Sequence, residues 1–316
     1  MENNNDGNDV AFAFALTFAA GLATCIGGLV IFSKRMVYLA NPISLTIALS
    51  ASCGVMLYIS LVEILNESKK GFQEGFEMDP LKRTSVMEGH ASALSTLLFV
   101  VGIAIVYLLD LVVHWLAPSH HHSLDLGELT ALRTSLMEDD KNMVQGGYTT
   151  PCFEQNEKEA LSRTGMLTAI AIALHNLPEG IATYIAAIDD TRFGIALACG
   201  IALHNIPEGV AVAAPVYFAT GSRWKGFKWT LISALAEPLG GILAWLMVGD
   251  EMSPFVSGIL YGLVSGMMVG VCFKEMLPTA RAYSKNKEHL IAYGVFSGMI
   301  VMASSLILFA YAGLDG

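Results

Sequence analysis

Two short segments of the chain carry the side chains most suited to chemistry, and both read His-Asn-x-Pro-Glu-Gly. The first begins at His175 and the second at His204. In a helix of about 3.6 residues per turn, the histidine, the asparagine after it and the glutamate four positions on share one face. Two imidazoles and two carboxylates placed together are a ligand set well suited to zinc. We therefore expect His175, Glu179, His204 and Glu208 to form a four-coordinate metal site.

A third glutamate, Glu237, lies in a later apolar segment, where a proline and two glycines follow it closely. Together with Asn176, Asn205 and the two motif glutamates, it predicts a second, oxygen-rich site beside the first. In this interpretation Glu179 and Glu208 bridge two ions. Oxygen ligands select among divalent ions less sharply than imidazole does, so the second site should be the less discriminating one.

The proline inside each motif should free a backbone oxygen beside the histidine. Proline has no N–H, so Pro178 and Pro207 leave the carbonyls of Leu174 and Leu203 without their helical partners. Broken turns of this kind are tolerated inside a membrane where the backbone lines a cavity. The freed carbonyls are therefore further candidate ligands.

A purely structural role is the alternative for these motifs, because buried Asn and His side chains also hydrogen-bond one membrane helix to another. Ionisable groups in the middle of an apolar span are costly unless they face partners, ions or water. The repetition of the motif and the third central carboxylate favour an ion route over helix-to-helix hydrogen bonds alone.

Four residues outside the motifs are candidates for the ion pathway. Asp110 and His114 share a helix face and could receive an ion that leaves the centre, although a hydrogen bond between them explains the pair equally well. Glu63 and Glu275 lie near opposite ends of their apolar segments and could line the entrance and the exit. A glutamate at a helix end more often simply meets water, so this alternative stays open.

The elements that position these side chains are apolar helices. Hydrophobic residues make up 54% of the 316 residues and charged residues only 15%, far from the soluble average of about one-quarter charged. A bilayer core takes about 20 helical residues to cross. The apolar runs are continuous, as in helices, and do not alternate with polar residues as barrel strands do. We expect an all-α membrane protein with eight transmembrane helices near 10–33, 43–65, 91–117, 164–186, 193–219, 229–249, 254–278 and 289–313.

Internal similarities indicate how these helices are arranged. The motif is shared by spans four and five, which run in opposite directions, so its two copies are inverted. A weaker similarity joins Gly54 to Leu65 in span two with Gly266 to Leu277 in span seven, which also run in opposite directions. An inverted 3+2+3 arrangement accounts for both similarities.

The longest polar connection, over 118–163, divides the chain. It begins with His120, His121 and His122, which could capture metal weakly, and its composition is typical of a mobile tether. We assign 1–117 to helices one to three, 118–163 to this flexible loop, 164–219 to helices four and five with the metal motifs, and 220–316 to helices six to eight.

Charge predicts orientation and excludes one class of partner. Loops on one side of the membrane carry twelve Lys and Arg residues, and the side with both termini carries five. By the positive-inside rule both termini face away from the cytosol. The net charge of −10 is spread along the chain and gives no sign of nucleic-acid binding.

At these motifs the chain resembles the ZIP (Zrt/Irt-like) family of metal transporters, and particularly its ZupT branch. The resemblance rests on the segments beginning at His175 and His204, on Glu237 and on the eight spans with a long His-bearing third loop. It implies a two-metal centre with His175, Glu179, His204 and Glu208 at the primary site. Pro238 stands where that branch is expected to have an aliphatic residue.

The resemblance also implies uptake of divalent ions into the cytosol and assembly as a homodimer. Zinc is the foremost expected ion, with iron, manganese, cobalt and cadmium as further ones. A plasma membrane is favoured over an organelle membrane.

Other function classes fit less well. The sequence has no His-Glu-x-x-His motif of a metalloprotease and no Gly-x-x-x-x-Gly-Lys-[Ser/Thr] loop for ATP, so we expect no enzyme. A metal-selective channel or a metal-sensing membrane protein is the alternative to a carrier, and flux that saturates with substrate would distinguish a carrier from a pore.

Overall fold

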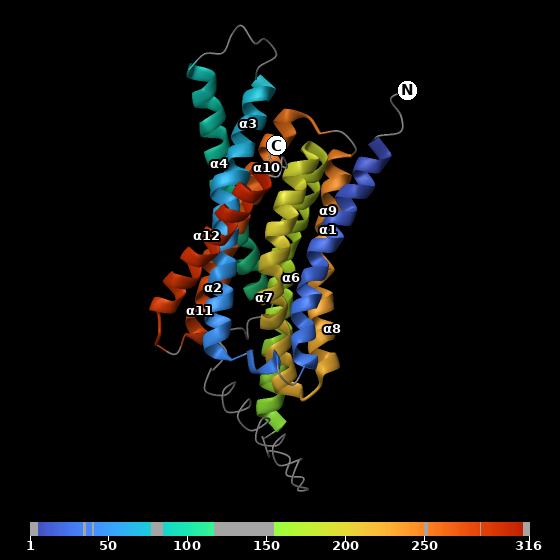
Figure 1. Ribbon diagram of the computed structural model, residues 1–316, viewed down its shortest axis with the longest axis vertical. Coiled ribbons are helices and arrows are strands. Elements are labelled where there is room, and N and C mark those ends of the chain that lie inside the picture. Colours follow the sequence, from blue (N-terminus) through green and yellow to red (C-terminus); the bar gives the residue numbers. More distant parts are fainter. Residues whose placement is uncertain are drawn as a thin grey trace.

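The computed structural model describes residues 6–33, 36–39, 41–76, 85–116, 155–249, 252–284 and 286–311. Across these ranges every regular element is a helix and no strand occurs, which confirms the all-helical expectation. The helices form one elongated bundle whose long axis is vertical in Figure 1. The elements are α1 (Asp6–Gly28), η1 (Leu29–Phe32), η2 (Met36–Leu39), α2 (Pro42–Tyr58), η3 (Ile59–Ile64), α3 (Leu65–Phe76), α4 (Ser85–Leu116), α6 (Gln155–Asp189), α7 (Thr191–Thr220), α8 (Arg223–Ala234), α9 (Ala236–Val248), α10 (Pro254–Val271), η5 (Cys272–Met276), α11 (Leu277–Tyr283) and α12 (His289–Tyr311).

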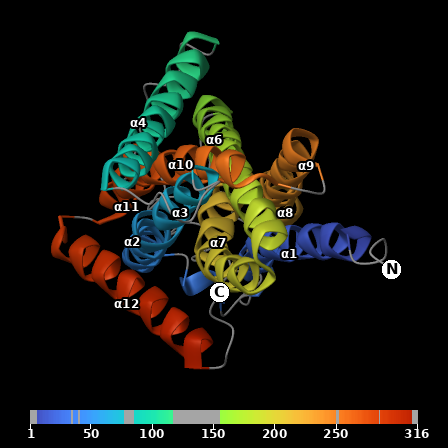
Figure 2. The same ribbon diagram turned by 90° about the horizontal axis from the view of Figure 1, so that it is seen from above.

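Among the described residues, seven helical stretches are long and apolar enough to cross a membrane. They correspond to expected spans one to three and five to eight, and α6 occupies the place of the fourth. The apolar stretches of α4 and α12 are only 17% buried, whereas that of the seventh span, Pro254–Tyr283, is 67% buried. Seen from above, α4 and α12 accordingly lie at the rim of the bundle (Figure 2). Their exposed leucines, isoleucines and valines suit a lipid surround.

Several helices extend beyond the limits expected from hydropathy. The helix α6 begins at Gln155, inside the range assigned to the loop, because 155–163 is polar but rich in strong helix formers such as Glu, Lys and Ala. The second span continues through η3 and α3 to Phe76, and the seventh continues through η5 and α11 to Tyr283. Hydropathy locates the apolar part of a helix, whereas hydrogen bonding decides where the helix ends.

The sixth span is broken in the middle. The helix α8 ends at Ala234 and α9 begins at Ala236, with Leu235 between them. Pro238 explains the break, because it lacks the N–H that would have bonded to the carbonyl of Ala234. The break leaves Glu237 buried in the first turn of α9.

Helices pack closely through glycines, in pairs that repeat. The helix α1 packs on α7, and α9 packs on α6. A β-carbon at Gly27 of α1 would strike the carbonyl of Ile206, and one at Gly240 of α9 would strike the carbonyl of Leu177. Ile206 and Leu177 hold the same position in the two motifs. The two contacts are therefore equivalent, although they join different helices.

A second repeated set of contacts holds the outer helices. The helix α2 packs on α12, and α10 packs on α4. Gly54 lies against the carbonyl of Val295, and Gly266 lies in the same way against the carbonyl of Phe99.

The start of α2 resembles the start of α10. The side chain of Asn41 caps α2 and that of Ser253 caps α10, each just before a proline. An Asn or Ser at this position satisfies a free backbone N–H of the first turn.

Candidate metal centre

The two His-Asn-x-Pro-Glu-Gly motifs meet where α6 and α7 pack against each other in the interior of the bundle. Both helices continue through Pro178 and Pro207. Seven polar side chains gather here and none is more than 3% exposed. They are the seven expected ligands: His175, Asn176, Glu179, His204, Asn205, Glu208 and Glu237.

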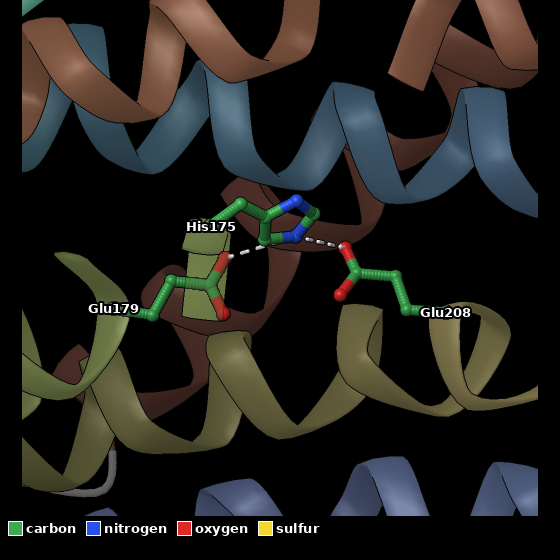
Figure 3. A group of neighbouring side chains, drawn as sticks. All are labelled: His175, Glu179 and Glu208. Carbon is green, nitrogen blue, oxygen red and sulfur yellow. Dashed lines mark ion pairs between the residues drawn. The ribbon is translucent and has the colours of Figure 1, made fainter. Parts of the chain in front are cut away.

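The histidine of each motif pairs with the glutamate of the other. The Nε2 atom of His175 lies 3.0 Å from Oε1 of Glu208, and Nε2 of His204 lies 2.8 Å from Oε1 of Glu179. Within its own motif, His175 is farther from Glu179, at 3.9 Å. Figure 3 shows the His175 ring between the two carboxylates. The helices therefore bring their ligands together crosswise.

Three of the four expected primary ligands converge on one point. One ligand atom each from His175, Glu179 and Glu208 lies within 4.8 Å of the others. His204 reaches Glu179 but is not part of this group, and its Nδ1 lies 3.2 Å from the carbonyl of Gly200. The described arrangement thus has a three-ligand core with His204 directly beside it.

The two asparagines lie on the side of the centre that faces α1 and the broken sixth span. The Nδ2 atom of Asn205 donates to Oε2 of Glu237 at 2.8 Å and to the carbonyl of Ala20 at 3.0 Å. The Nδ2 atom of Asn176 donates to the carbonyl of Ser233 at 3.1 Å. Both amide nitrogens are therefore occupied, which orients each side-chain oxygen away from these partners.

Many oxygen atoms of the centre have no hydrogen-bond partner among the described residues. Buried polar atoms are normally hydrogen-bonded, because an unsatisfied one costs about 1–3 kcal/mol. Several such oxygens in one place are available to coordinate a cation. They are Oδ1 of Asn176, Oε2 of Glu179, Oδ1 of Asn205, Oε2 of Glu208 and Oε1 of Glu237.

Of the pathway candidates, Asp110 has a partner that the sequence analysis did not assign. Its Oδ2 atom lies 2.9 Å from Nζ of Lys274, which also lies over the ring of Tyr107. One oxygen of the neighbouring Glu275 is buried without a hydrogen-bond partner in the described structure. The pairing joins α4 to η5 across a sequence separation that no local pattern reveals.

The remaining candidates are placed only in part. Glu63 lies half-buried in η3, and Glu275 lies in η5, and both segments are π-helical turns within long helices. The backbone of His114 belongs to α4, but its side chain lies outside the described residues, and so do His120, His121 and His122.

The backbone carbonyls of Ala20 and Ser233 were missed as anchors for the two asparagines. Every residue has a carbonyl, so no sequence signal could have singled them out.

Comparison with known proteins shows the family to which the chain belongs. The family model described as ZIP zinc transporter matches residues 10–306. The chain is 39% identical over 304 residues to a zinc transporter ZupT of Stenotrophomonas maltophilia (strain R551-3), which covers 96% of this chain and 97% of that protein. It is 37% identical to a zinc transporter ZupT of Chlorobium chlorochromatii (strain CaD3), over 96% of this chain and 99% of that protein.

The match with the family model covers nearly all of the apolar helices, and it includes both motifs and Glu237. The resemblance to the ZupT branch is confirmed by relatives that align over almost their whole length. The chain therefore belongs to the ZIP zinc transporter family, a family of transporters and not of enzymes.

Proposed function

We propose that this protein carries divalent metal ions, zinc foremost, across a membrane into the cytosol through a two-metal centre between α6, α7 and the broken helix α8–α9. The observation that supports the proposal most directly is the crossed pairing of His175 with Glu208 and of His204 with Glu179 in the apolar interior. Such groups are costly at this depth unless they serve an ion. The relatives named zinc transporter point to zinc as the first ion to test.

In this proposal the primary ion binds between the motifs. His175, Glu179 and Glu208 already converge, and a small rotation of the His204 side chain away from Glu179 would complete four ligands. Imidazole and carboxylate in tetrahedral geometry are typical of zinc sites. An arriving dication would take the place of the present contacts between imidazole and carboxylate.

The second ion would bind on the oxygen side of the centre. Asn176, Asn205 and Glu237 present side-chain oxygens there that have no partner in the described structure. Glu179 and Glu208 each have a further unpartnered oxygen, so both can bridge to the second ion. Because this site has only oxygen ligands, we expect it to accept manganese, iron(II), cobalt and cadmium as well as zinc.

We further propose that the helices follow the inverted 3+2+3 arrangement. Helix α1 and the α8–α9 pair make matching glycine contacts to the two motif helices, and α2 and α10 make matching contacts to α12 and α4. The π-helical turns η3 and η5 hold Glu63 and Glu275 at corresponding places. Because π-helical turns are frequent at functional sites, this supports a role for both glutamates in the pathway.

Several features of the proposal extend beyond the centre. We propose a homodimer in the plasma membrane with both termini outside the cytosol, consistent with the asymmetry of Lys and Arg. The His-bearing loop would receive or regulate metal without forming the route through the membrane. Replacing His120, His121 and His122 by Ser should therefore change apparent affinity or turnover only modestly.

The experiment that tests this function is metal uptake into vesicles that contain the purified protein. Zinc uptake should depend on the protein and saturate with rising zinc concentration. Once the binding centre of every carrier is filled, the rate of the transport cycle limits uptake. Manganese, iron(II), cobalt and cadmium should compete with zinc. Absence of protein-dependent uptake would contradict the proposal.

A metal-selective channel is the alternative function. Flux through a channel would increase with zinc well beyond the concentration that fills the binding sites. A metal sensor would bind zinc in the same preparation without moving it.

A further inference from the structure

Two buried hydroxyls beside the centre, those of Thr24 and Ser233, have no hydrogen-bond partner among the described residues, and that of Thr24 has no role in the function proposed above. Thr24 lies in α1, its side chain is 0% exposed, and its Oγ1 atom has no hydrogen-bond partner among the described residues. A buried hydroxyl without a partner is costly.

The other helical threonines show how unusual this is. A threonine in a helix ordinarily donates its hydroxyl to the carbonyl four residues earlier. Six threonines in the described helices do so: Thr17, Thr46, Thr96, Thr183, Thr220 and Thr230. The carbonyl four residues before Thr24 belongs to Ala20, and it accepts instead from Nδ2 of Asn205. A residue of the centre thus takes the usual acceptor of Thr24.

Thr24 lies on the face of α1 that meets the metal centre. Its carbonyl would be struck by a β-carbon at Gly209, the residue that follows Glu208. One turn earlier, a β-carbon at Gly21 would lie 3.4 Å from Cβ of Glu237. The backbone of α1 around Thr24 therefore packs against both the end of the second motif and the first turn of α9, which carries Glu237.

Thr24 also corresponds to Glu237 in the repeated contacts. A β-carbon at Gly180, the residue after Glu179, would strike the carbonyl of Glu237. In the same way, a β-carbon at Gly209 would strike the carbonyl of Thr24. The hydrogen bonds of the two motif asparagines support this correspondence. Asn205 donates to the carbonyl of Ala20, four residues before Thr24, and Asn176 donates to the carbonyl of Ser233, four residues before Glu237. Equivalent backbone positions direct equivalent side chains, so the threonine hydroxyl faces the centre from α1 as the glutamate carboxylate does from α9.

We propose that the Oγ1 atom of Thr24 is a further ligand of the oxygen-rich ion site, on the opposite side from Glu237. The inference rests on the proposed two-metal centre and adds a residue to it. A hydroxyl is a neutral oxygen ligand of the kind that hard divalent ions accept.

The neutral ligand also suits the charge of the site. With Glu179, Glu208 and Glu237, the centre has three carboxylates for two divalent ions. A neutral ligand from α1 completes the shell without a fourth negative charge that would hold the ions more tightly.

The test compares variants with and without the hydroxyl in the purified full-length protein. Thr24→Val keeps the shape of the side chain and removes the hydroxyl, Thr24→Ala also removes it, and Thr24→Ser retains it. The number of manganese and zinc ions bound per chain is measured by equilibrium dialysis with elemental analysis over a range of metal concentrations. Thr17→Val is the matched control, because Thr17 lies in the same helix and bonds only to its own backbone at Ala13.

We expect Thr24→Val and Thr24→Ala to weaken binding of the second ion by at least about tenfold, since even loss of a residue that only hydrogen-bonds to a metal ligand typically weakens metal binding 10–100-fold. Thr24→Ser and Thr17→Val should bind both ions like the parent, and the first zinc ion should remain in all four variants. Both variants lack the hydroxyl, but only Thr24→Ala also leaves a smaller side chain. A defect shared by the two variants therefore reports loss of the hydroxyl, and a defect of Thr24→Ala alone reports loss of packing.

Two results would overturn the inference. Parental binding of the second ion by Thr24→Val would show that the hydroxyl is not a ligand, and so would a Thr24→Ser variant as weak as Thr24→Val. Glu237→Gln, measured in parallel, distinguishes this failure from a wider one. If Glu237→Gln loses the second ion while Thr24→Val keeps it, only the Thr24 assignment is wrong; if a second ion never binds even to the parent, the two-metal proposal itself is wrong.

Discussion

At the residue scale, the crosswise pairing explains why the motif has to occur twice. A single helix face offers one imidazole and one carboxylate, and in α6 these two groups, His175 and Glu179, lie 3.9 Å apart. The shorter contacts run between the helices, from His175 to Glu208 and from His204 to Glu179. A dication held there is bound by both helices, so movement of one helix against the other changes its coordination.

Removal of a primary ligand should stop transport. We expect His175→Ala and Glu208→Ala to reduce zinc uptake to background, because each removes one of the three converging ligands and leaves a charged or polar partner buried alone. Uptake is measured in vesicles with equal amounts of folded protein. His289→Ala is the control, since this histidine is exposed at the start of α12, and it should transport like the parent. Undiminished uptake by either centre variant would rule out the assignment.

The two ion sites should differ in metal selectivity. Imidazole favours zinc, whereas oxygen ligands alone favour it less. We expect His204→Ala to lose zinc uptake preferentially over manganese uptake, and Glu237→Gln to keep slow zinc transport while it loses one bound ion. Competition between zinc and manganese, measured with metal counting, separates the two effects. Identical selectivity in both variants would mean that the sites do not divide the ligands in this way.

At the scale of the elements, each helix that carries an expected ligand also has either a glycine that permits close packing or a break in its backbone hydrogen bonds. Glycines bring α1 onto α7 and α9 onto α6, with backbone in contact with backbone. The break at Leu235 lets the sixth span place Glu237 at the start of a helix, where the helix dipole favours a negative charge. The geometry of the centre therefore depends also on residues that are not among the expected ligands.

A methyl group at one of these crossings should damage both stability and transport. A β-carbon at Gly180 would strike the carbonyl of Glu237, and backbone cannot easily move aside. We expect Gly180→Ala to destabilise the protein by about 1–3 kcal/mol, as overpacking usually does, and to reduce zinc uptake.

The matched control for this change is Gly89→Ala. Its β-carbon would meet nothing, and alanine is the better helix former by about 0.5–1 kcal/mol, so thermal stability should be unchanged or higher. Thermal unfolding in detergent checks both variants. A Gly180→Ala protein as stable and active as Gly89→Ala would show that α6 and α9 can move apart at this contact without loss of stability or transport.

At the scale of the whole molecule, the core and the rim have different tasks. The motif helices, α1 and the broken span surround the centre, while α4 and α12 lie at the rim and expose apolar side chains (Figure 2). Matching contacts on the two sides of α6 and α7 support a molecule built from two inverted halves, in which the centre lies at the crossing of the repeats. A site so placed can be opened toward either side of the membrane by equivalent movements.

The proposed orientation predicts which loops can be labelled from outside the cell. In a variant whose five cysteines are replaced, Thr191→Cys and Lys225→Cys place single thiols near opposite ends of α7, in exposed positions. An impermeant maleimide should label the Thr191→Cys protein in intact cells and should label the Lys225→Cys protein only after the cells are opened. The reverse pattern would mean that the termini face the cytosol.

Much of the fold and the candidate site could be predicted from the sequence, for reasons that are local. Continuous apolar runs require helices in lipid, and the spacing of His175, Asn176 and Glu179 places them on one helix face. Those rules involve neighbours within about one turn, so they needed no knowledge of the fold. The helix ends were less predictable, because polar helix formers extend α6 back to Gln155.

Tertiary structure alone decided which side chains meet. Three contacts depend on how separate helices pack, and two of them join helices far apart in the sequence. They are the pairing of His175 with Glu208, the pairing of Lys274 with Asp110 and the hydrogen bond from Asn205 to the carbonyl of Ala20. The sequence by itself determined an apolar helical chain with two inverted ligand motifs. Packing determined how they face each other, because the approach of two helices depends on glycines and backbone carbonyls, which carry no chemical signature until they are brought into contact.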